Sequence, residues 1–190
     1  MTTGPVLDFL LTRRSRPARL LQAPVPDRAR LTTLLTAAAR VPDHGKLEPW
    51  RFIVLERAAL QRLAVEAEAH GQAQGMADEK VAKGRDQFAR SPLCVAVIAS
   101  PRDSARIPEI EQTLSAGAVC LSLVNAALAD GWGASWLTGW VALDAAFAGR
   151  AFDLAPGEWV AGLIHIGTCE STPPERERPD MAAITTWVES

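Results

Sequence analysis

The sequence has few of the residues that would commit it to metal, disulfide or nucleic-acid chemistry. It holds three cysteines and three histidines, and its 20 basic and 22 acidic residues give a formal net charge of −2. The charges are spread along the chain without a basic stripe, so a nucleic acid is not an expected partner. The cysteines lie in or beside apolar runs, which fits free thiols in a reducing compartment better than a disulfide framework.

No segment has the pattern of a signal peptide or a membrane span. No basic residue precedes the apolar stretch near the N-terminus, and the apolar run at residues 116–129 is shorter than the ~20 residues that a span needs. We therefore expect a cytoplasmic protein without a membrane partner. Because 48% of the 190 residues are hydrophobic, we also expect residues 1–190 to form a single domain with its own core.

Several catalytic motifs are missing as well. There is no Gly-x-x-x-x-Gly-Lys-Ser/Thr loop for nucleotide phosphates and no Gly-x-Ser-x-Gly turn for a hydrolase nucleophile. His44, His70 and His165 stand apart without the spacing of metal ligands, so metal catalysis is not expected. The Gly-Trp-Gly at 131–133 follows a helical pattern and precedes a strand pattern, which is the reverse of a dinucleotide-binding turn.

Hydrophobic periodicity predicts an α+β layer fold. Thr3 and Asp27 are expected to cap the first two helices. The segment from 58 to 89 predicts broken surface helices, because glycines interrupt it. The helix at 111–130 is apolar nearly all round, which predicts burial in the middle of the protein. The expected elements are helices ending near 15 and at 40, strands at 51–55, 93–98, 132–137 and 160–167, a short helix at 143–147, and a polar connection at 171–179 to a C-terminal segment at 181–188.

Cationic and hydrogen-bonding side chains remain at the ends of these elements. Arg13, Arg14 and Ser15 come where the first helix has to end, because Pro17 disfavours helical angles at the residue before it. A pair of guanidinium groups with a hydroxyl can hold a phosphate. Two arginines at a helix end can equally satisfy the last carbonyl groups of that helix, so both readings stay open.

Two further groups lie later in the chain. Arg40 and His44 flank Pro42 in a loop, and residues 136–138 end the third predicted strand. Taken alone, His44 is an ordinary loop residue and Trp136 is a core residue. Their functional reading depends on the combination.

The combination resembles the nitroreductase family, and specifically its short branch. Four segments carry the resemblance in the order of the family, and they span nearly the whole chain. These are Arg13-Arg14-Ser15; residues 40–52, with the sequence Arg-Val-Pro-Asp-His-Gly-Lys-Leu-Glu-Pro-Trp-Arg-Phe; Glu111-Gln112 with Leu114-Ser115-Ala116-Gly117; and the turn and strand at 131–139. The resemblance implies a central antiparallel-dominated sheet flanked by helices, in a homodimer with two FMN sites at the subunit interface.

The resemblance also implies roles for individual residues. Arg13, Arg14 and Ser15 would hold the phosphate and ribityl end of FMN, and Arg40 and His44 would reach that flavin from the partner subunit. The region at 58–89 would set the specificity of the pocket. Trp136, Leu137 and Thr138 would line the isoalloxazine ring, and the donor NADH or NADPH would meet the segment of Ala126, Ala127, Leu128, Ala129, Asp130 and Gly131.

The implied activity is that of an oxidoreductase. Hydride would pass from NAD(P)H through FMN to a small electron acceptor, a nitro-compound or quinone, in a ping-pong cycle. Because the flavin carries the chemistry, no side chain is named as a catalytic acid or base. Arg14 or Lys46 could supply the positive charge that stabilises reduced flavin.

Three departures from the pattern leave alternatives open. Lys46 and Glu48 stand where the wider superfamily usually has an asparagine and a glutamine, and Leu137 stands where this branch can have an arginine. An FMN-binding sensor or scaffold without turnover therefore remains an alternative. A flavin-free interaction protein that uses the helices of residues 58–89 is a third reading.

Overall fold

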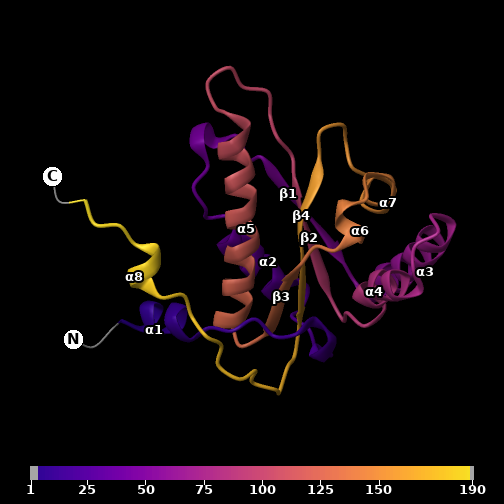
Figure 1. Ribbon diagram of the computed structural model, residues 1–190, viewed down its shortest axis with the longest axis horizontal. Helices are drawn as coiled ribbons and strands as arrows, with labels where there is room; N and C mark the ends of the chain where they lie inside the picture. Colours follow the sequence, from indigo (N-terminus) through magenta and orange to yellow (C-terminus); the bar gives the residue numbers. More distant parts are fainter. Residues whose placement is uncertain (1–3, 189–190) are drawn as a thin grey trace.

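The computed structural model describes residues 4–188, which form one sheet with helices on both faces (Figure 1). The strands are β1 (Trp50–Leu55), β2 (Cys94–Ala99), β3 (Gly133–Leu137) and β4 (Trp159–Gly167). The helices are α1 (Pro5–Thr12), α2 (Arg28–Ala38), α3 (Arg57–Ala73), α4 (Asp78–Ala89), α5 (Glu109–Ala129), α6 (Trp140–Leu143), α7 (Ala145–Ala151) and α8 (Met181–Ile184), with short 3-10 turns η1 (Ala18–Leu20) and η2 (His44–Lys46).

The sheet is antiparallel throughout its described strands, in the order β1-β2-β4-β3. Every residue of β2 is buried, because the strand has a neighbour on each side and helices over both faces. This confirms the central position that its continuous apolar run predicts. The α+β class with an antiparallel sheet is thereby confirmed.

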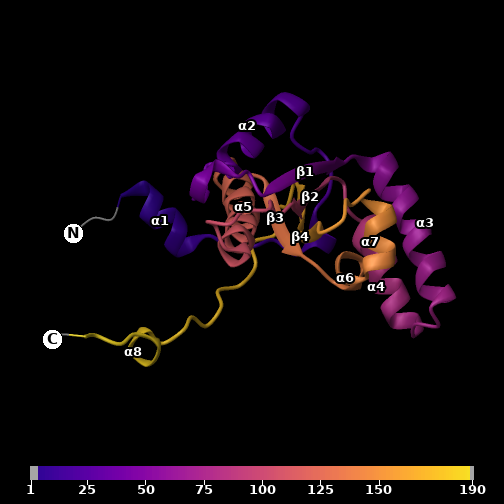
Figure 2. The ribbon, with the colours of Figure 1, turned by 90° about the horizontal axis from the view of Figure 1, so that it is seen from above.

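The two faces of the sheet carry different helical layers (Figure 2). Along β2, Val95 and Val97 pack with α2 and α5 in one core cluster. The alternate residue Ile98 packs on the other side, with Phe88 of α4 and Phe147 of α7. Side chains of successive strand residues point to opposite faces, so one apolar strand supplies both cores.

Helix α5 packs on the sheet with one face and leaves the other face open. Ala116, Val119 and Leu123 are buried, but Leu114 is 65% exposed and Leu121 47% exposed. The expectation that this helix is buried all round is therefore wrong for the single chain. Among the described residues, α5 is the one helix long and apolar enough to span a membrane, and its packing against the sheet accounts for the apolar residues of its buried face.

The segment from 58 to 89 is broken once, and both of its helices are partly buried. Gly75, with a φ of +64°, lies between α3 and α4, whereas Gly71 and Gly84 lie inside the helices. Leu60 and Phe88 are fully buried. The prediction of broken helices is confirmed, but these helices form a layer of the core instead of lying on its surface.

Helix caps explain two further boundaries. Asp27 caps α2 by accepting a hydrogen bond from the backbone N–H of Arg30, as expected. Asp144 accepts from the N–H of Phe147 and starts α7, so the single short helix predicted at 143–147 is wrong and two helices meet there. Thr3 lies outside the described residues, and α1 ends at Thr12, before the predicted end.

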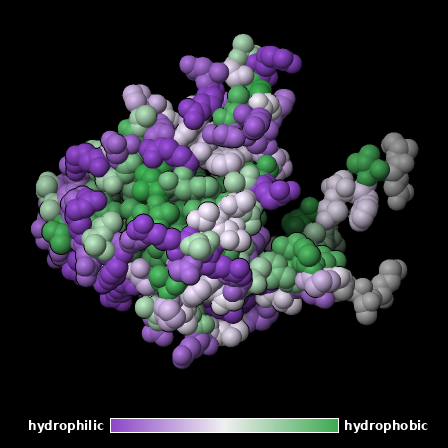
Figure 3. Space-filling model, turned by 180° about the vertical axis from the view of Figure 1, so that it is seen from behind, coloured by the Kyte–Doolittle hydropathy of each residue, from purple (hydrophilic) through white to green (hydrophobic). Residues whose placement is uncertain are grey.

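Exposed apolar side chains gather on the terminal segments. The helix α1 and the C-terminal segment project on the same side of the molecule, the side on which α5 lies (Figures 1 and 2). A hydrophobic patch at the position of α1 is visible from behind (Figure 3). The exposed residues are Val6, Leu7, Leu10 and Leu11 in α1, and Met181, Ile184, Trp187 and Val188 near the C-terminus.

Candidate functional site

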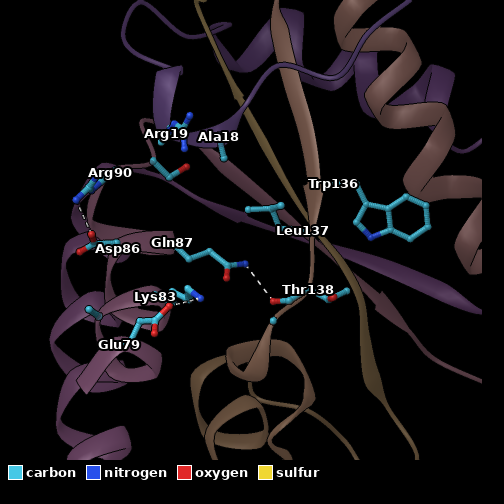
Figure 4. Close-up of a pocket in the computed structure, with 13 residues that line it drawn as sticks. Ala18, Arg19, Glu79, Lys83, Asp86, Gln87, Arg90, Trp136, Leu137 and Thr138 are labelled. Carbon is cyan, nitrogen blue, oxygen red and sulfur yellow. Dashed lines mark hydrogen bonds and ion pairs between the residues drawn. The ribbon is translucent and has the colours of Figure 1, made fainter. Parts of the chain in front are cut away.

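A cavity of about 670 Å³ opens between α4 and the end of β3 (Figure 4). Lys83 and Gln87 line it from α4, and Leu137 and Thr138 line it from β3 and the residue that follows. Arg19 of η1 stands at a third wall. Three segments far apart in the sequence therefore build one concave site, of the size that small ligands occupy.

Two hydrogen bonds hold α4 against the residues that follow β3. The Gln87 side-chain amide donates to the Thr138 carbonyl at 3.1 Å, and the Trp140 indole N–H donates to the Lys80 carbonyl at 2.9 Å. Trp140 can lie this close because α4 has Gly84 there, where a Cβ would overlap the indole ring. The turn at Gly139 has a φ of +72°, which glycine adopts readily. The width of the cavity is fixed by these contacts.

The side chains of β3 alternate between the cavity and the α5 layer. Leu137 points into the cavity, whereas the indole of Trp136 points away from it (Figure 4). That indole donates to the Ala161 carbonyl at 3.2 Å and lies over Gly162, next to Cys120 of α5. Of the three residues predicted to line a ring, Leu137 points its side chain into the cavity, Thr138 presents its backbone carbonyl to Gln87 there, and Trp136 borders the cavity without its indole.

One lining cation is left without a partner. Lys83 pairs with Glu79 at 2.7 Å, and Arg90 pairs with Asp86 at 2.6 Å. Within residues 4–188, no ion pair or hydrogen bond of the Arg19 side chain is found. The cavity wall therefore carries one uncompensated positive charge, which favours an anionic ligand.

The segment after α1 connects to the strand that forms the cavity. The N–H of Arg16 donates to the Ala134 carbonyl of β3 at 2.8 Å. One guanidinium nitrogen of Arg13 donates to the Ser15 hydroxyl at 3.1 Å, so these two predicted site residues are together. The Nε of Arg13 is buried and has no acceptor among the described residues. An anion would satisfy this donor, so Arg13 and Ser15 fit a phosphate group.

The electrostatic surroundings of Arg13 agree with that fit. Burial, and then the positive charges of Arg178 and Arg14, lower the pKa of Arg13. A bound anion would relieve the repulsion among these guanidinium groups.

Arg14 has a different environment from Arg13. Its guanidinium donates to the Pro174 carbonyl and lies 3.6 Å from the Glu175 carboxylate. Its acceptor is thus on the C-terminal segment, not on the last turn of α1. The helix-end reading does not describe this residue, since Arg14 ties the C-terminal segment to the start of the chain.

The loop before β1 is held in an unusual backbone conformation. The Asp43 carboxylate accepts hydrogen bonds from the N–H groups of Leu47 and Glu48, at 3.1 and 2.9 Å. Gly45, Lys46 and Glu48 all have positive φ angles, of +70°, +54° and +48°. Left-handed backbone is uncommon outside glycine and asparagine, and it gathers at functional sites.

The loop presents its candidate side chains on the surface. Arg40 and His44 are exposed, and His44 Nδ1 lies 2.7 Å from Oε2 of Glu111 in the first turn of α5. Neither residue lines the cavity of its own chain. The structure of one chain therefore separates this predicted half of the site from the half at β3.

His165, the one buried histidine of the described chain, lies behind Ser91 of the cavity wall and contacts no charged group. Burial lowers the pKa of His165 to about 4. Its Nδ1 lies 2.8 Å from the Ser91 hydroxyl, which donates to the Leu93 carbonyl. Because that serine proton is used, His165 donates from Nδ1. Ser91 borders the cavity, whereas His165 is a packed core residue.

Comparison with known proteins decides the family. The family model of the nitroreductases matches residues 10–168. The chain belongs to the nitroreductase family. It is thus an oxidoreductase, and the expected family and class of enzyme are confirmed.

The relatives of this nitroreductase match it over most of its length. The Escherichia coli protein YdjA, which is named among the NAD(P)H nitroreductases, is 32% identical over 162 residues, covering 85% of this chain and 87% of YdjA. A Haemophilus influenzae protein with the same type of name is 37% identical over 167 residues, with coverage of 85% and 87%.

Solved structures share the fold of this nitroreductase. A nitroreductase-like protein from Bacillus cereus has a TM-score of 0.79 at 22% identity, and the match covers 100% of this chain and 99% of that one. A Desulfovibrio desulfuricans structure, described as a nitroreductase in complex with FMN, has a TM-score of 0.75 at 22% identity, with 98% of each chain covered.

The predicted donor segment of the nitroreductase lies away from the cavity. Residues 126–131 form the last turn of α5 and the two residues that follow it, and Ala126 and Ala129 border a separate hollow beside α1. Asp130 pairs with Arg30 and accepts from the Trp132 indole at 3.0 Å. The structure thus keeps this segment together, next to the start of β3, but does not bring it to the cavity at the end of that strand within one chain.

No motif or spacing in the sequence singles out Arg19, Lys83 or Gln87. These residues reach the site only because η1 and α4 fold against the end of β3. The available signal was Gly84 within an otherwise polar helix, since a glycine inside a helix often marks a close contact. Here that contact is with Trp140.

Proposed function

We propose that this nitroreductase binds FMN and uses NADH or NADPH to reduce a nitro-compound or a quinone. The observation that carries the proposal is the cavity between α4 and β3, with its apolar Leu137 and its uncompensated Arg19. Bound FMN would supply the ring that accepts hydride from the donor and passes it on. The FMN of the Desulfovibrio structure and the names of the relatives support this choice of cofactor and donor.

The protein's own residues would bind and orient that cofactor. Arg13 and Ser15 would hold the phosphate, since the buried Nε of Arg13 lacks an acceptor in the described chain. Leu137 would give the ring an apolar wall. Arg14 is engaged by the C-terminal segment and Lys46 lies in the loop beside α5, so we propose Arg19 as the cation that the cavity offers to negative charge.

We propose that the site is completed in a homodimer. The open face of α5 and the apolar face of α1 would be covered by a second copy, because monomers rarely expose so much contiguous apolar surface. Arg40 and His44 would then reach the partner's cavity. Residues 126–131 would meet the nicotinamide donor, with exposed Ala129 and Gly131 as the accessible positions.

We further propose that residues 1–190 act as one domain in the cytoplasm. Cys94 and Cys120 are buried free thiols, and burial raises the pKa of Cys120 to about 12. Such thiols are unreactive and agree with a reducing compartment.

Spectroscopy of the purified protein tests the cofactor. We expect the purified protein to show flavin absorbance. We also expect the fluorescence of FMN to be quenched when FMN is titrated into ligand-free protein. Arg13→Ala should weaken FMN binding by at least about tenfold while the fold is retained, because a charge-assisted phosphate contact is lost. Arg106→Ala, at an exposed arginine before α5, is the matched control. If wild-type protein shows no FMN binding in this titration, the proposal is wrong.

Anaerobic mixing with NADH and NADPH tests turnover. Rapid loss of flavin absorbance, restored by adding a quinone or a nitro-compound, is the expected result. Absorbance that persists with both donors would favour a flavin-binding sensor or scaffold instead.

A further inference from the structure

The first turns of α5 hold the loop that carries His44 through side-chain hydrogen bonds. Ser115 donates its hydroxyl to the Pro42 carbonyl at 2.8 Å and accepts from the Trp50 indole at 3.2 Å. Glu111 lies four residues earlier, which places it on the same face of the helix. Its Oε2 lies 2.7 Å from Nδ1 of His44. Two side chains of one helix face thus hold both the start of the loop and the imidazole.

The backbone of the loop is already fixed without Glu111. The Asp43 carboxylate binds two N–H groups further along the loop. Gly45 has a positive φ, and Ile107 lies where any Cβ at this position would be. The remaining freedom at His44 is the rotation of its side chain and the choice of the nitrogen that carries the proton. Glu111 acts on both.

A carboxylate at Nδ1 decides which nitrogen His44 presents. The Glu111 carboxylate is an acceptor, so the contact requires a proton on Nδ1 of His44. Nε2 is then the free nitrogen of the exposed imidazole. In other proteins, a hydrogen bond at one ring nitrogen sets the role of the other in the same way.

We propose that Glu111 is a positioning residue that fixes the tautomer and orientation of His44, so that Nε2 meets the FMN of the partner subunit. This inference rests on the proposed function, in which His44 crosses to the partner's cavity. The alternative is a purely structural role for Glu111, because an acidic residue in the first turn of a helix also stabilises that helix through its dipole. Glu109 lies in the same turn and provides the comparison.

The first experiment measures the imidazole itself in ligand-free protein. Nitrogen-15 shifts of His44, recorded where the ring is neutral, should show the proton on Nδ1. Glu111→Ala should give a mixture of tautomers, and Glu111→Gln should keep the proton on Nδ1, because its amide oxygen still accepts. Glu109→Ala should leave the shifts unchanged. Unchanged shifts in Glu111→Ala would overturn the proposal.

The second experiment is a double-mutant cycle on FMN affinity, measured by titration. Glu111→Ala should weaken FMN binding about fivefold, the effect of about one hydrogen bond. Glu111→Gln should keep most of the wild-type affinity. In a His44→Ala background, Glu111→Ala should have no further effect. Equal losses with and without His44 would overturn the proposal in favour of a structural role.

The outcomes separate this inference from the proposed function. If wild-type protein binds FMN but His44→Ala binds it equally well, the inference fails and the function stands. If wild-type protein binds no FMN, the function fails, and with it the proposed meeting of Nε2 with the flavin. The nitrogen-15 shifts would still report whether Glu111 fixes the imidazole.

Discussion

The cavity at β3 and the loop before β1 hold their candidate residues in different ways. In the cavity, Gln87 bonds to the Thr138 carbonyl and Lys83 pairs with Glu79, around a concave wall to which Arg19 adds an unpaired charge. In the loop, the backbone is tightly held and His44 contacts Glu111, yet His44 and Arg40 are exposed on the surface and line no cavity of their own chain. A single chain therefore builds the wall of a site in one region and presents outward-facing groups in the other, as a site shared between two copies requires.

The largest expected effect comes from breaking the cavity. Gly84→Leu places a side chain where the Trp140 indole lies, so α4 must move away from β3. We expect a loss of about 1–3 kcal/mol in the free energy of unfolding, with FMN binding abolished. Urea unfolding and FMN titration measure the two effects.

Gly149→Ala is the control for this substitution, because a Cβ at Gly149 of α7 meets nothing within 4 Å. It should leave FMN binding unchanged. Tight FMN binding by Gly84→Leu would contradict the assignment of the cavity.

A second variant tests the ion pair that joins β1, the strand after the loop, to the residue before β4. Arg51 of β1 makes two hydrogen bonds to the Glu158 carboxylate, at 2.8 and 2.7 Å, and this bonding, with Ser100, lowers the pKa of Glu158 to about 2. Glu158→Gln should cost about 1–3 kcal/mol of unfolding free energy at neutral pH. Glu56→Gln, in the exposed pair with Arg28, should cost less than about 1 kcal/mol.

The pH dependence of unfolding gives the sign of that interaction. A carboxylate with a lowered pKa in the folded state contributes stability above its unfolded pKa, near 4.5, and loses it as the pH falls through about 2. The wild type should therefore lose more stability between pH 5 and 2 than Glu158→Gln, in buffer-matched thermal melts. Parallel curves for the two proteins would refute this role of Glu158.

The smallest expected effect sharpens the contrast at the loop. Lys46 has a φ of +54°, so Lys46→Gly should relieve backbone strain and raise the unfolding free energy by about 0.5–1 kcal/mol. Lys46→Ala removes the same side chain but keeps the strain, and it should not stabilise the fold. Equal stabilities for the two variants would show that the loop is not strained at this position.

Local sequence patterns predicted the elements whose environment lies within the chain. The apolar run of β2 predicted a central strand, and Asp27 predicted the start of α2, because both depend on neighbouring residues. The open face of α5 was missed, since periodicity shows that Leu114 and Leu121 need cover but not whether the same chain provides it.

The site residues were less predictable where distant segments meet. Arg14 binds the Pro174 carbonyl 160 residues away, and Gln87 binds Thr138 across 51 residues. No local pattern encodes such contacts. The assignment of Arg13, Ser15 and His44 to a flavin site rests on family resemblance, and their roles stay predictions.

Mixed dimers of two defective variants test the shared site most directly. Arg13→Ala and His44→Ala each damage every site when alone. If each site takes Arg13 from one subunit and His44 from the other, a mixed dimer holds one intact and one doubly damaged site. Random mixing should then restore wild-type FMN affinity at about one site in four. No recovery, with mixed dimers shown to form, would mean that each chain builds its site alone.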